Sequence, residues 1–229
     1  MSNLISSETM HEVMEWAYEK ATDGIGLGSS VDMAKDYLSE SGSLEDKINS
    51  LIRWQNTKAG SAGFVTGISG LATLSATLPA NIASTLYIQI RMISAIAYMA
   101  GYDIKHDKVK TMVYICLLGH GTGEVLKDFG VTAGTKFAEN FIKKKITGEM
   151  LAKINKAVGF RLVTKAGSTG LINLTKLVPV LGGVVSGTFD AVTTNLVGNT
   201  ARDMFLDKNN QNFDGFVGRV YDENGDLIR

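Results

Sequence analysis

The feature that most limits how this chain can fold is a long uncharged stretch rich in small residues. "GFVTGISGLATLSATLPANIASTLYIQIR", residues 63–91, contains no charged side chain before Arg91. Residues 59–78 alone give twenty consecutive uncharged positions, the nominal length of a transmembrane helix. Half of these positions are glycine, serine or threonine, and an arginine at the centre of a bilayer costs about 3 kcal/mol. The stretch therefore favours helices in a protein core over a membrane span.

The glycines of this stretch are regularly spaced. Gly60, Gly63, Gly67 and Gly70 follow one another at intervals of three or four residues, which places them on one face of a helix. Each glycine weakens an isolated helix by about 1 kcal/mol relative to alanine. Such a face is tolerated where a second helix approaches the backbone closely. We therefore expect a tightly packed helical hairpin, with residues 80–101 as its second helix.

Helical patterns extend over most of the chain. Apolar residues recur at helical spacing in residues 7–21, and Ser29 with Asp32 and Ser43 with Asp46 have the form of capping boxes. The predicted helices are 7–21, two that begin near 30 and 44, 80–101, 107–127, 132–146, 147–166, and a hairpin over 171–205 bent at 179–183. The prediction is an all-α, compact multi-helix bundle that forms one domain over residues 1–206.

The last residues have a different pattern. Apolar residues precede Asn224-Gly225, a dipeptide typical of a type I′ turn between two strands. We expect residues 207–229 to form a tail that contains a small β-hairpin.

Charge is balanced overall but unevenly placed. The formal net charge is zero, which argues against nucleic acid as a partner because that binding needs a dominant basic field. Residues 1–46 hold ten acidic and two basic side chains, whereas residues 136–165 hold eight basic and two acidic ones. One interpretation is that acidic and basic helices face each other. The other is a basic face, including Lys143, Lys144, Lys145 and Lys153, that binds anionic lipid or an acidic partner.

Two charged residues lie within apolar helical patterns. Arg91 is a cation in the middle of the predicted helix 80–101, and Asp190 is an anion inside "VVSGTFDAVTTNLV". An unpaired buried charge is very costly. We expect Arg91 and Asp190 either to pair and fix the helix register, or to share a binding site for a ligand or ion.

No catalytic motif is found in the sequence. His120 and Glu124 stand four residues apart, but two side chains are too few to hold zinc. Cys116 lies in an apolar run, which is typical of an inert thiol. We expect a protein that is not an enzyme and that needs neither a metal nor a cofactor. The N-terminus has neither a basic start nor a long apolar run, so we expect no signal peptide and a cytoplasmic location.

Two blocks of the sequence resemble the EcsC family of bacterial proteins. The first, residues 51–103, has a glycine-rich helix, a Pro-Ala turn, a Gln-x-Arg-Met motif and a Gly-Tyr-Asp ending. The second, residues 177–205, contains Pro179, Gly182, Gly183 and Asp190. The resemblance covers roughly residues 10–206, and it implies an all-helical bacterial protein of a family without an established activity, so it brings no catalytic residues to this chain. The family takes its name from a protein encoded beside an ABC exporter, so the resemblance also implies a link to such an exporter.

Three functions follow from these patterns. The first is a non-enzymatic accessory protein that associates peripherally with the inner face of the cell membrane, through lipid or a membrane protein. The second is a soluble helical protein that binds a hydrophobic small molecule or lipid in an internal cavity beside the glycines. The third is a hydrolase that uses His120 and Glu124.

Overall fold

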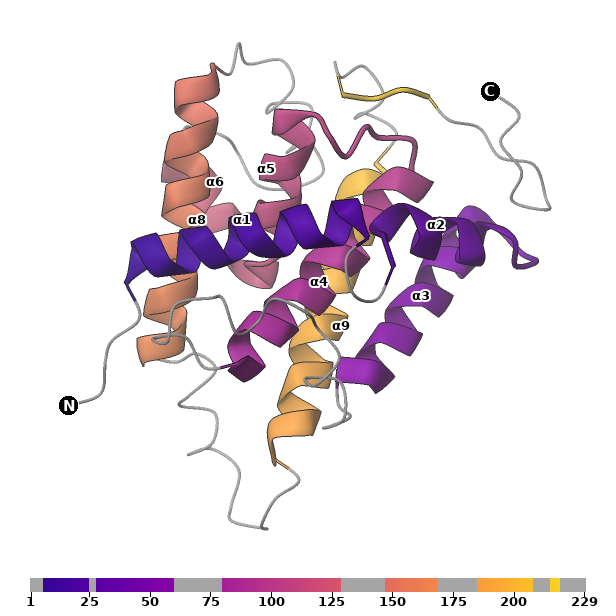
Figure 1. Ribbon diagram of the computed structural model, residues 1–229, viewed down its shortest axis with the longest axis horizontal. Coiled ribbons are helices and arrows are strands. Elements are labelled where there is room, and N and C mark those ends of the chain that lie inside the picture. The colour runs from indigo at the N-terminus through magenta and orange to yellow at the C-terminus, as the bar shows by residue number, and fades with distance from the viewer. Residues whose placement is uncertain are drawn as a thin grey trace.

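The protein is all-α, as predicted from the sequence. A computed structural model describes residues 6–24, 28–59, 80–128, 147–168, 185–207 and 215–218. These residues form a compact bundle of helices (Figure 1). The elements are α1 (Ser7–Asp23), α2 (Ser30–Leu38), α3 (Leu44–Ala59), α4 (Ala80–Met99), α5 (Asp107–Cys116), a 3-10 turn (Gly119–Gly121), α6 (Thr122–Asp128), α8 (Gly148–Ser168) and α9 (Val185–Phe205).

The helices begin where local capping chemistry directs them. Ser29 accepts a hydrogen bond from the Asp32 amide, and Asp32 accepts one from the Ser29 amide, so the predicted capping box of α2 is complete. Ser43 and Asp46 make the same reciprocal pair at the start of α3. These side chains satisfy amide groups that have no partner within their own helix.

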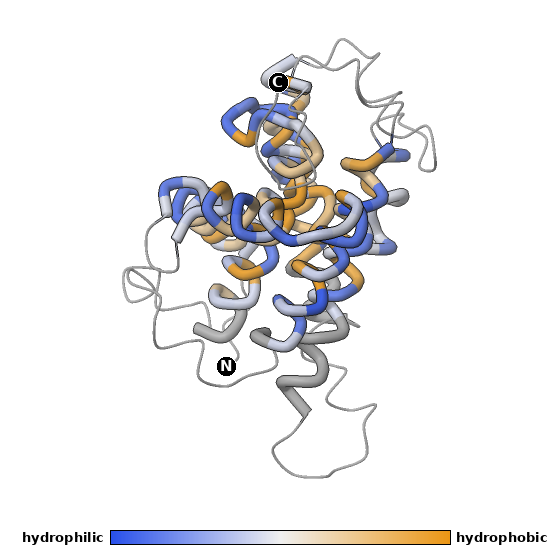
Figure 2. The backbone as a smooth tube through the Cα atoms, turned by 90° about the vertical axis from the view of Figure 1, so that its right-hand side faces the viewer, coloured by the Kyte–Doolittle hydropathy of each residue, from blue (hydrophilic) through white to orange (hydrophobic). Residues whose placement is uncertain are grey.

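The most buried helix is α4. It packs against α1, α2, α3, α5 and α9, and the apolar residues in Figure 2 are concentrated along the middle of the molecule. Its second half is almost entirely buried, from Tyr87 to Ala97. The predicted helix 80–101 is therefore confirmed as a core helix, although the glycine-rich half of the predicted hairpin lies outside the described residues.

The contacts of α9 fix the directions of α3 and α4. Arg202 donates to Asn49 at 2.8 Å, and Gly198 faces Ile52, so α3 and α9 run antiparallel. Gln89 donates to Thr194 at 3.3 Å. The contact of Met92 with Gly198 lies further along both chains, so α4 and α9 run parallel.

One consequence concerns the ends of these helices. The last residue of α3 and the first residues of α4 and α9 lie at the same end of the bundle, at the bottom of Figure 1. The last residue of α8 also lies toward that end (Figure 1). We call this the lower end, and it is defined by Ala59, Ala80, Ser168 and Val185.

The prediction of one continuous helix over 107–127 is wrong. α5 ends at Cys116, and the chain passes through a 3-10 turn before α6 begins at Thr122. Gly119 in this turn has a φ of 53°, a left-handed conformation that favours glycine. A methyl group at Gly119 would lie 2.8 Å from Leu196 Cδ2. The break in the helix thus lies where the chain packs closely against α9, at a glycine with a left-handed backbone conformation.

A glycine also allows three helices to meet closely at Gly198. A methyl group there would lie 2.9 Å from Ile52 Cγ1 and Cγ2 on α3, and 3.2 Å from Met92 Cε on α4. Ile52 is β-branched and buried, so it has little freedom to move aside. Glycine thus allows close helix packing at this position of the bundle.

We expect Gly198→Ala to lower the free energy of unfolding by about 1 kcal/mol, because overpacking of about 1–3 kcal/mol outweighs a gain of about 1 kcal/mol in helix propensity. In an Ile52→Ala background the same change should be stabilising, because the added methyl group then fills empty space. Urea unfolding of the unchanged chain, the two single variants and the double variant measures whether the effect of Gly198→Ala on the unfolding free energy changes sign. Gly148→Ala is the control, since a methyl group at Gly148 has no neighbour within 4 Å. Stabilisation by Gly198→Ala in the otherwise unchanged chain would contradict the packing argument.

Residues 215–218 lie against the connection between α4 and α5. Tyr102 and Phe216 form an isolated antiparallel bridge, with Asp103 donating to Gly215 at 2.7 Å and Val217 donating to Gly101 at 2.9 Å. The predicted hairpin at Asn224-Gly225 lies outside the described residues. Among the helices of the described ranges, none is both long enough and apolar enough to cross a bilayer.

Candidate functional site

Arg91 on α4 is the most deeply buried arginine of the described residues, at 7% exposure. Its Nε donates to the carbonyl oxygen of Gly28 at 2.9 Å, in the connection that precedes α2. Burial lowers the pKa of Arg91, and Tyr87, Asp32 and Asp36 oppose that effect. The guanidinium therefore stays charged and faces the first turn of α2.

Asp32 has two roles in this site. Its carboxylate accepts hydrogen bonds from the Ser29 hydroxyl at 2.8 Å and from the Ser29 amide at 3.1 Å. These bonds lower the pKa of Asp32, and the positive charge of Arg91 contributes a little. A methyl group at Gly28 would lie 3.6 Å from Arg91 Nη2 and 3.9 Å from Asp32 Oδ2. The cap of α2 thus lies next to a buried cation on α4.

The predicted pairing of Arg91 with Asp190 is not tested. Asp190 belongs to α9, but its side chain lies outside the described residues. What the structure adds is an unexpected set of neighbours for Arg91 at the start of α2. No sequence pattern pointed to them, because Gly28 is 63 residues away along the chain.

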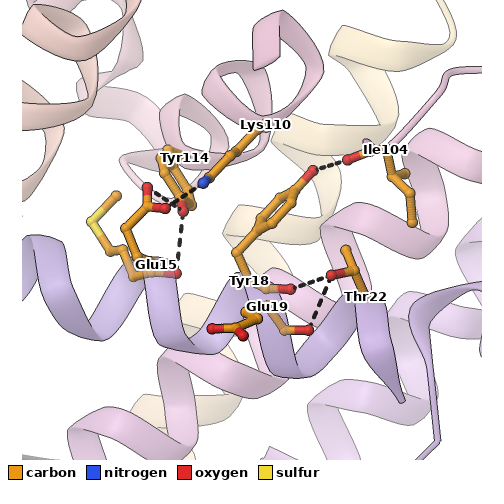
Figure 3. A network of polar contacts seen from close by, with 8 residues as sticks. Glu15, Tyr18, Glu19, Thr22, Ile104, Lys110 and Tyr114 are labelled. Atoms are coloured by element: carbon orange, nitrogen blue, oxygen red, sulfur yellow. Dashed lines mark hydrogen bonds and ion pairs between the residues drawn. The ribbon is translucent and has the colours of Figure 1, made fainter. Parts of the chain in front are cut away.

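A second polar cluster joins α1 to α5 (Figure 3). Lys110 forms an ion pair with Glu15, and the Tyr114 hydroxyl donates to Glu15 Oε1 at 3.0 Å. The Lys110 ammonium lies 5.4 Å from the centre of the Tyr18 ring and 5.9 Å from that of Tyr114, within the range of cation–π attraction. The Tyr18 hydroxyl donates to the carbonyl oxygen of Ile104. We call these four side chains, Glu15, Tyr18, Lys110 and Tyr114, the α1–α5 clamp.

The α1–α5 clamp holds α1 against α5, and the protonation states of its two tyrosines fit this structural role. Burial raises the pKa of the Tyr18 phenol, and nearby acidic side chains, Asp103 first, raise it further. Burial also raises the pKa of Tyr114, and the charge and hydrogen bond of Glu15 add to the effect. Both phenols are therefore protonated hydrogen-bond donors near neutral pH, not general bases. The cluster holds α1 across the bundle and offers no activated nucleophile.

Cys116 and His120, the described residues that could take part in catalysis, lie outside the α1–α5 clamp. Cys116 is fully buried next to Met204, with Sγ 3.5 Å from Sδ, and burial raises the pKa of its thiol. His120 is exposed in the 3-10 turn, while the side chain of Glu124 is outside the described residues. Among the described residues, no three His, Cys, Asp or Glu side chains converge as metal ligands.

The predicted basic face is described only at Lys153. This side chain is exposed on α8 and pairs with Glu149 at 2.8 Å. Lys143, Lys144 and Lys145 lie outside the described residues, as do Gly60, Gly63, Gly67 and Gly70. The predicted internal cavity beside those glycines therefore stays a prediction.

The interpretation that acidic and basic helices face each other has some support. α1 packs against α8, and a methyl group at Gly159 on α8 would lie 3.4 Å from the Ser7 carbonyl oxygen on α1. The pKa of Glu8 is lowered mainly by local hydrogen bonds, to its backbone and to Ser7, and slightly by Lys156 of α8.

Sequence reasoning missed the α1–α5 clamp and the cap of α2 as partners of Arg91. Glu15 and Lys110 are 95 residues apart, so no local spacing connects them. One available signal was the helical spacing of Glu15 with Tyr18, and of Lys110 with Tyr114, which puts each pair on one face.

Comparison with known proteins gives the family. The model of the EcsC protein family matches residues 1–206. The chain therefore belongs to the EcsC family, which confirms the resemblance seen in the two sequence blocks. Among curated proteins and solved structures, none matches this chain significantly.

Proposed function

We propose that this EcsC-family protein is a non-enzymatic accessory protein that associates peripherally with the inner face of the cell membrane. The observation that carries the proposal is the position of four helix ends. Ala59 and Ala80, which flank the uncharged residues 60–79, both lie at the lower end of the bundle. Ser168 and Val185, which flank residues 169–184, lie toward the same end.

The two segments that begin and end there are the least charged long stretches of the chain. Residues 60–79 contain no charged side chain, and residues 169–184 contain only Lys176. Two nearly uncharged segments that start from one end of a helical body allow that end to contact an apolar phase.

The non-enzymatic part of the proposal has separate support. The two phenols of the α1–α5 clamp and the Cys116 thiol have pKa values raised by burial. Catalytic nucleophiles and bases usually have pKa values shifted toward neutrality instead. The described groups are therefore suited to structure more than to catalysis.

Flotation of the full chain with lipid vesicles tests the proposal. We expect the protein to float with vesicles of phosphatidylcholine and phosphatidylglycerol at low salt, and to float less as salt screens the attraction. Vesicles of phosphatidylcholine alone serve as the control and should bind less protein. A chain that stays entirely unbound to the anionic vesicles at low salt would overturn the proposal.

A further inference from the structure

The solvent side of α8 is an amphipathic surface with an unusual composition. Its exposed side chains are Glu149, Ala152, Lys153, Lys156 and Phe160, which are linked by intervals of three or four positions and so share one face. We call these five residues the α8 outer face. Leu151, Ile154 and Val158 are buried on the opposite side and attach α8 to the core. The one acidic side chain of the outer face, Glu149, lies among the lysines and pairs with Lys153.

Phe160 gives this face a large exposed apolar side chain at its C-terminal end. It is 55% exposed, one of three large apolar side chains that are at least half exposed among the described residues. It stands about two turns before the end of α8 at Ser168, after which residues 169–184, with Lys176 as their one charged side chain, follow in sequence. A basic helix face with one exposed aromatic side chain is a composition found on helices that lie in the interface of a membrane.

The neighbouring helices α8 and α1 carry opposite net charges, so an anionic surface acts differently on each of them. α8 carries Lys153, Lys156, Arg161 and Lys165 against one acidic residue, Glu149. α1 crosses α8 (Figure 1), and its most exposed side chains are all acidic: Glu8, Glu12, Glu19 and Asp23. A negatively charged surface attracts the first helix and repels the second.

The pairing of Lys153 does not remove its charge from this face. Lys153 and Glu149 are both largely exposed, at 65% and 77% of their side-chain surface. An exposed pair of this kind contributes little to stability and is screened by salt. Lys153 can therefore leave Glu149 for another anionic group at low cost.

We propose that the α8 outer face is the surface by which the protein contacts an anionic lipid bilayer. Lys153 and Lys156 bind lipid phosphates, and Phe160 inserts at the boundary between headgroups and acyl chains. The proposal rests on the proposed membrane association and adds a second contact surface beside the lower end of the bundle, where α8 ends at Ser168.

Charge substitutions test the electrostatic part of this contact. We expect Lys153→Gln with Lys156→Gln to weaken binding to phosphatidylglycerol vesicles by about fivefold for each lysine. The matched control is Lys35→Gln with Arg53→Gln, which removes two exposed charges from α2 and α3 and should change binding by less than about twofold, because these charges lie on other helices. Thermal unfolding of both variants checks that the fold is intact.

A fluorescent label tests the insertion of Phe160. Cys116 is fully buried, so an environment-sensitive dye reacts at an introduced cysteine. We expect Phe160→Cys carrying the dye to shift to the blue with anionic vesicles. Trp54→Cys is the matched control, because Trp54 is 53% exposed on α3, and its dye should shift much less.

The outcomes separate the surface from the function. If the chain binds vesicles but both double variants weaken binding equally, or the dye at 54 shifts more than the dye at 160, the surface is wrong and membrane association stands. If no vesicle binds the unsubstituted chain, both proposals fail. Binding that depends on Lys153 and Lys156 without any shift at 160 indicates electrostatic contact with the headgroups alone, and overturns the insertion of Phe160.

Discussion

Replacing Tyr102 with alanine is expected to lower the free energy of unfolding by about 4 kcal/mol, the size of effect seen when a large aromatic side chain is removed from a core. Tyr102 is fully buried. Its ring packs edge-on against Phe205 at 5.1 Å and against Phe216 at 5.3 Å between ring centres. One side chain thus connects the end of α4 with the end of α9 and with residues 215–218. Urea unfolding monitored by circular dichroism measures the loss.

Two further substitutions test whether the aromatic contacts are the cause. Tyr102→Phe keeps both ring contacts and should cost less than about 1.5 kcal/mol, because the volume is nearly conserved. Val217→Ala changes a half-exposed neighbour of Phe216 and should change stability by less than about 0.5 kcal/mol. If Tyr102→Ala were no more harmful than Val217→Ala, the aromatic cluster would not hold these elements together.

Arg91→Ala is expected to cost about 3 kcal/mol, the order found when one partner of a buried charge interaction is removed. The change takes a donor from the Gly28 carbonyl and a cation from the neighbourhood of Asp32 and Asp36. It also removes a long aliphatic stem from the core. The urea concentration at the midpoint of unfolding should fall, while the slope of the unfolding free energy against urea concentration (the m value) stays the same.

Companion variants identify the partner of Arg91. Arg91→Met keeps most of the packing and should cost less than Arg91→Ala, whereas Arg53→Ala on the exposed side of α3 should have almost no effect. A double-mutant cycle with Asp32→Asn should give a coupling of about 0.5 kcal/mol or more. A parallel cycle with Asp190→Ala tests the pairing predicted from the sequence. If the Asp32 effects simply add, the cap of α2 is not an electrostatic partner of Arg91.

Membership of the EcsC family and the all-α class could be read from the sequence, because both depend on patterns within one segment or on similarity over whole blocks. The starts of α2 and α3 were also predictable, since Ser29 with Asp32 and Ser43 with Asp46 are separated by only three residues. The failure at 107–127 has a clear reason. Helical spacing continues through Gly119, whereas in the structure α5 ends at Cys116 and Gly119 takes a left-handed φ against Leu196 of α9.

The candidate sites were predictable only in part. An arginine inside an apolar helix pattern indicated that Arg91 needs partners, because a buried charge is costly wherever it lies. Which groups provide them depends on how α2 is placed against α4. The α8 outer face likewise needed the burial of Leu151, Ile154 and Val158 to show which side of the helix meets solvent.

The sequence by itself determined most of the described helices, most of their first residues and the need to compensate the charge of Arg91, because capping and helical periodicity act over a few residues. Only the tertiary structure decided that the Gly28 carbonyl accepts from Arg91, that Glu15 meets Lys110 and that Gly198 allows three helices to converge. Each of these contacts joins segments that are distant along the chain. Their formation depends on the packing of whole helices, which no local pattern encodes.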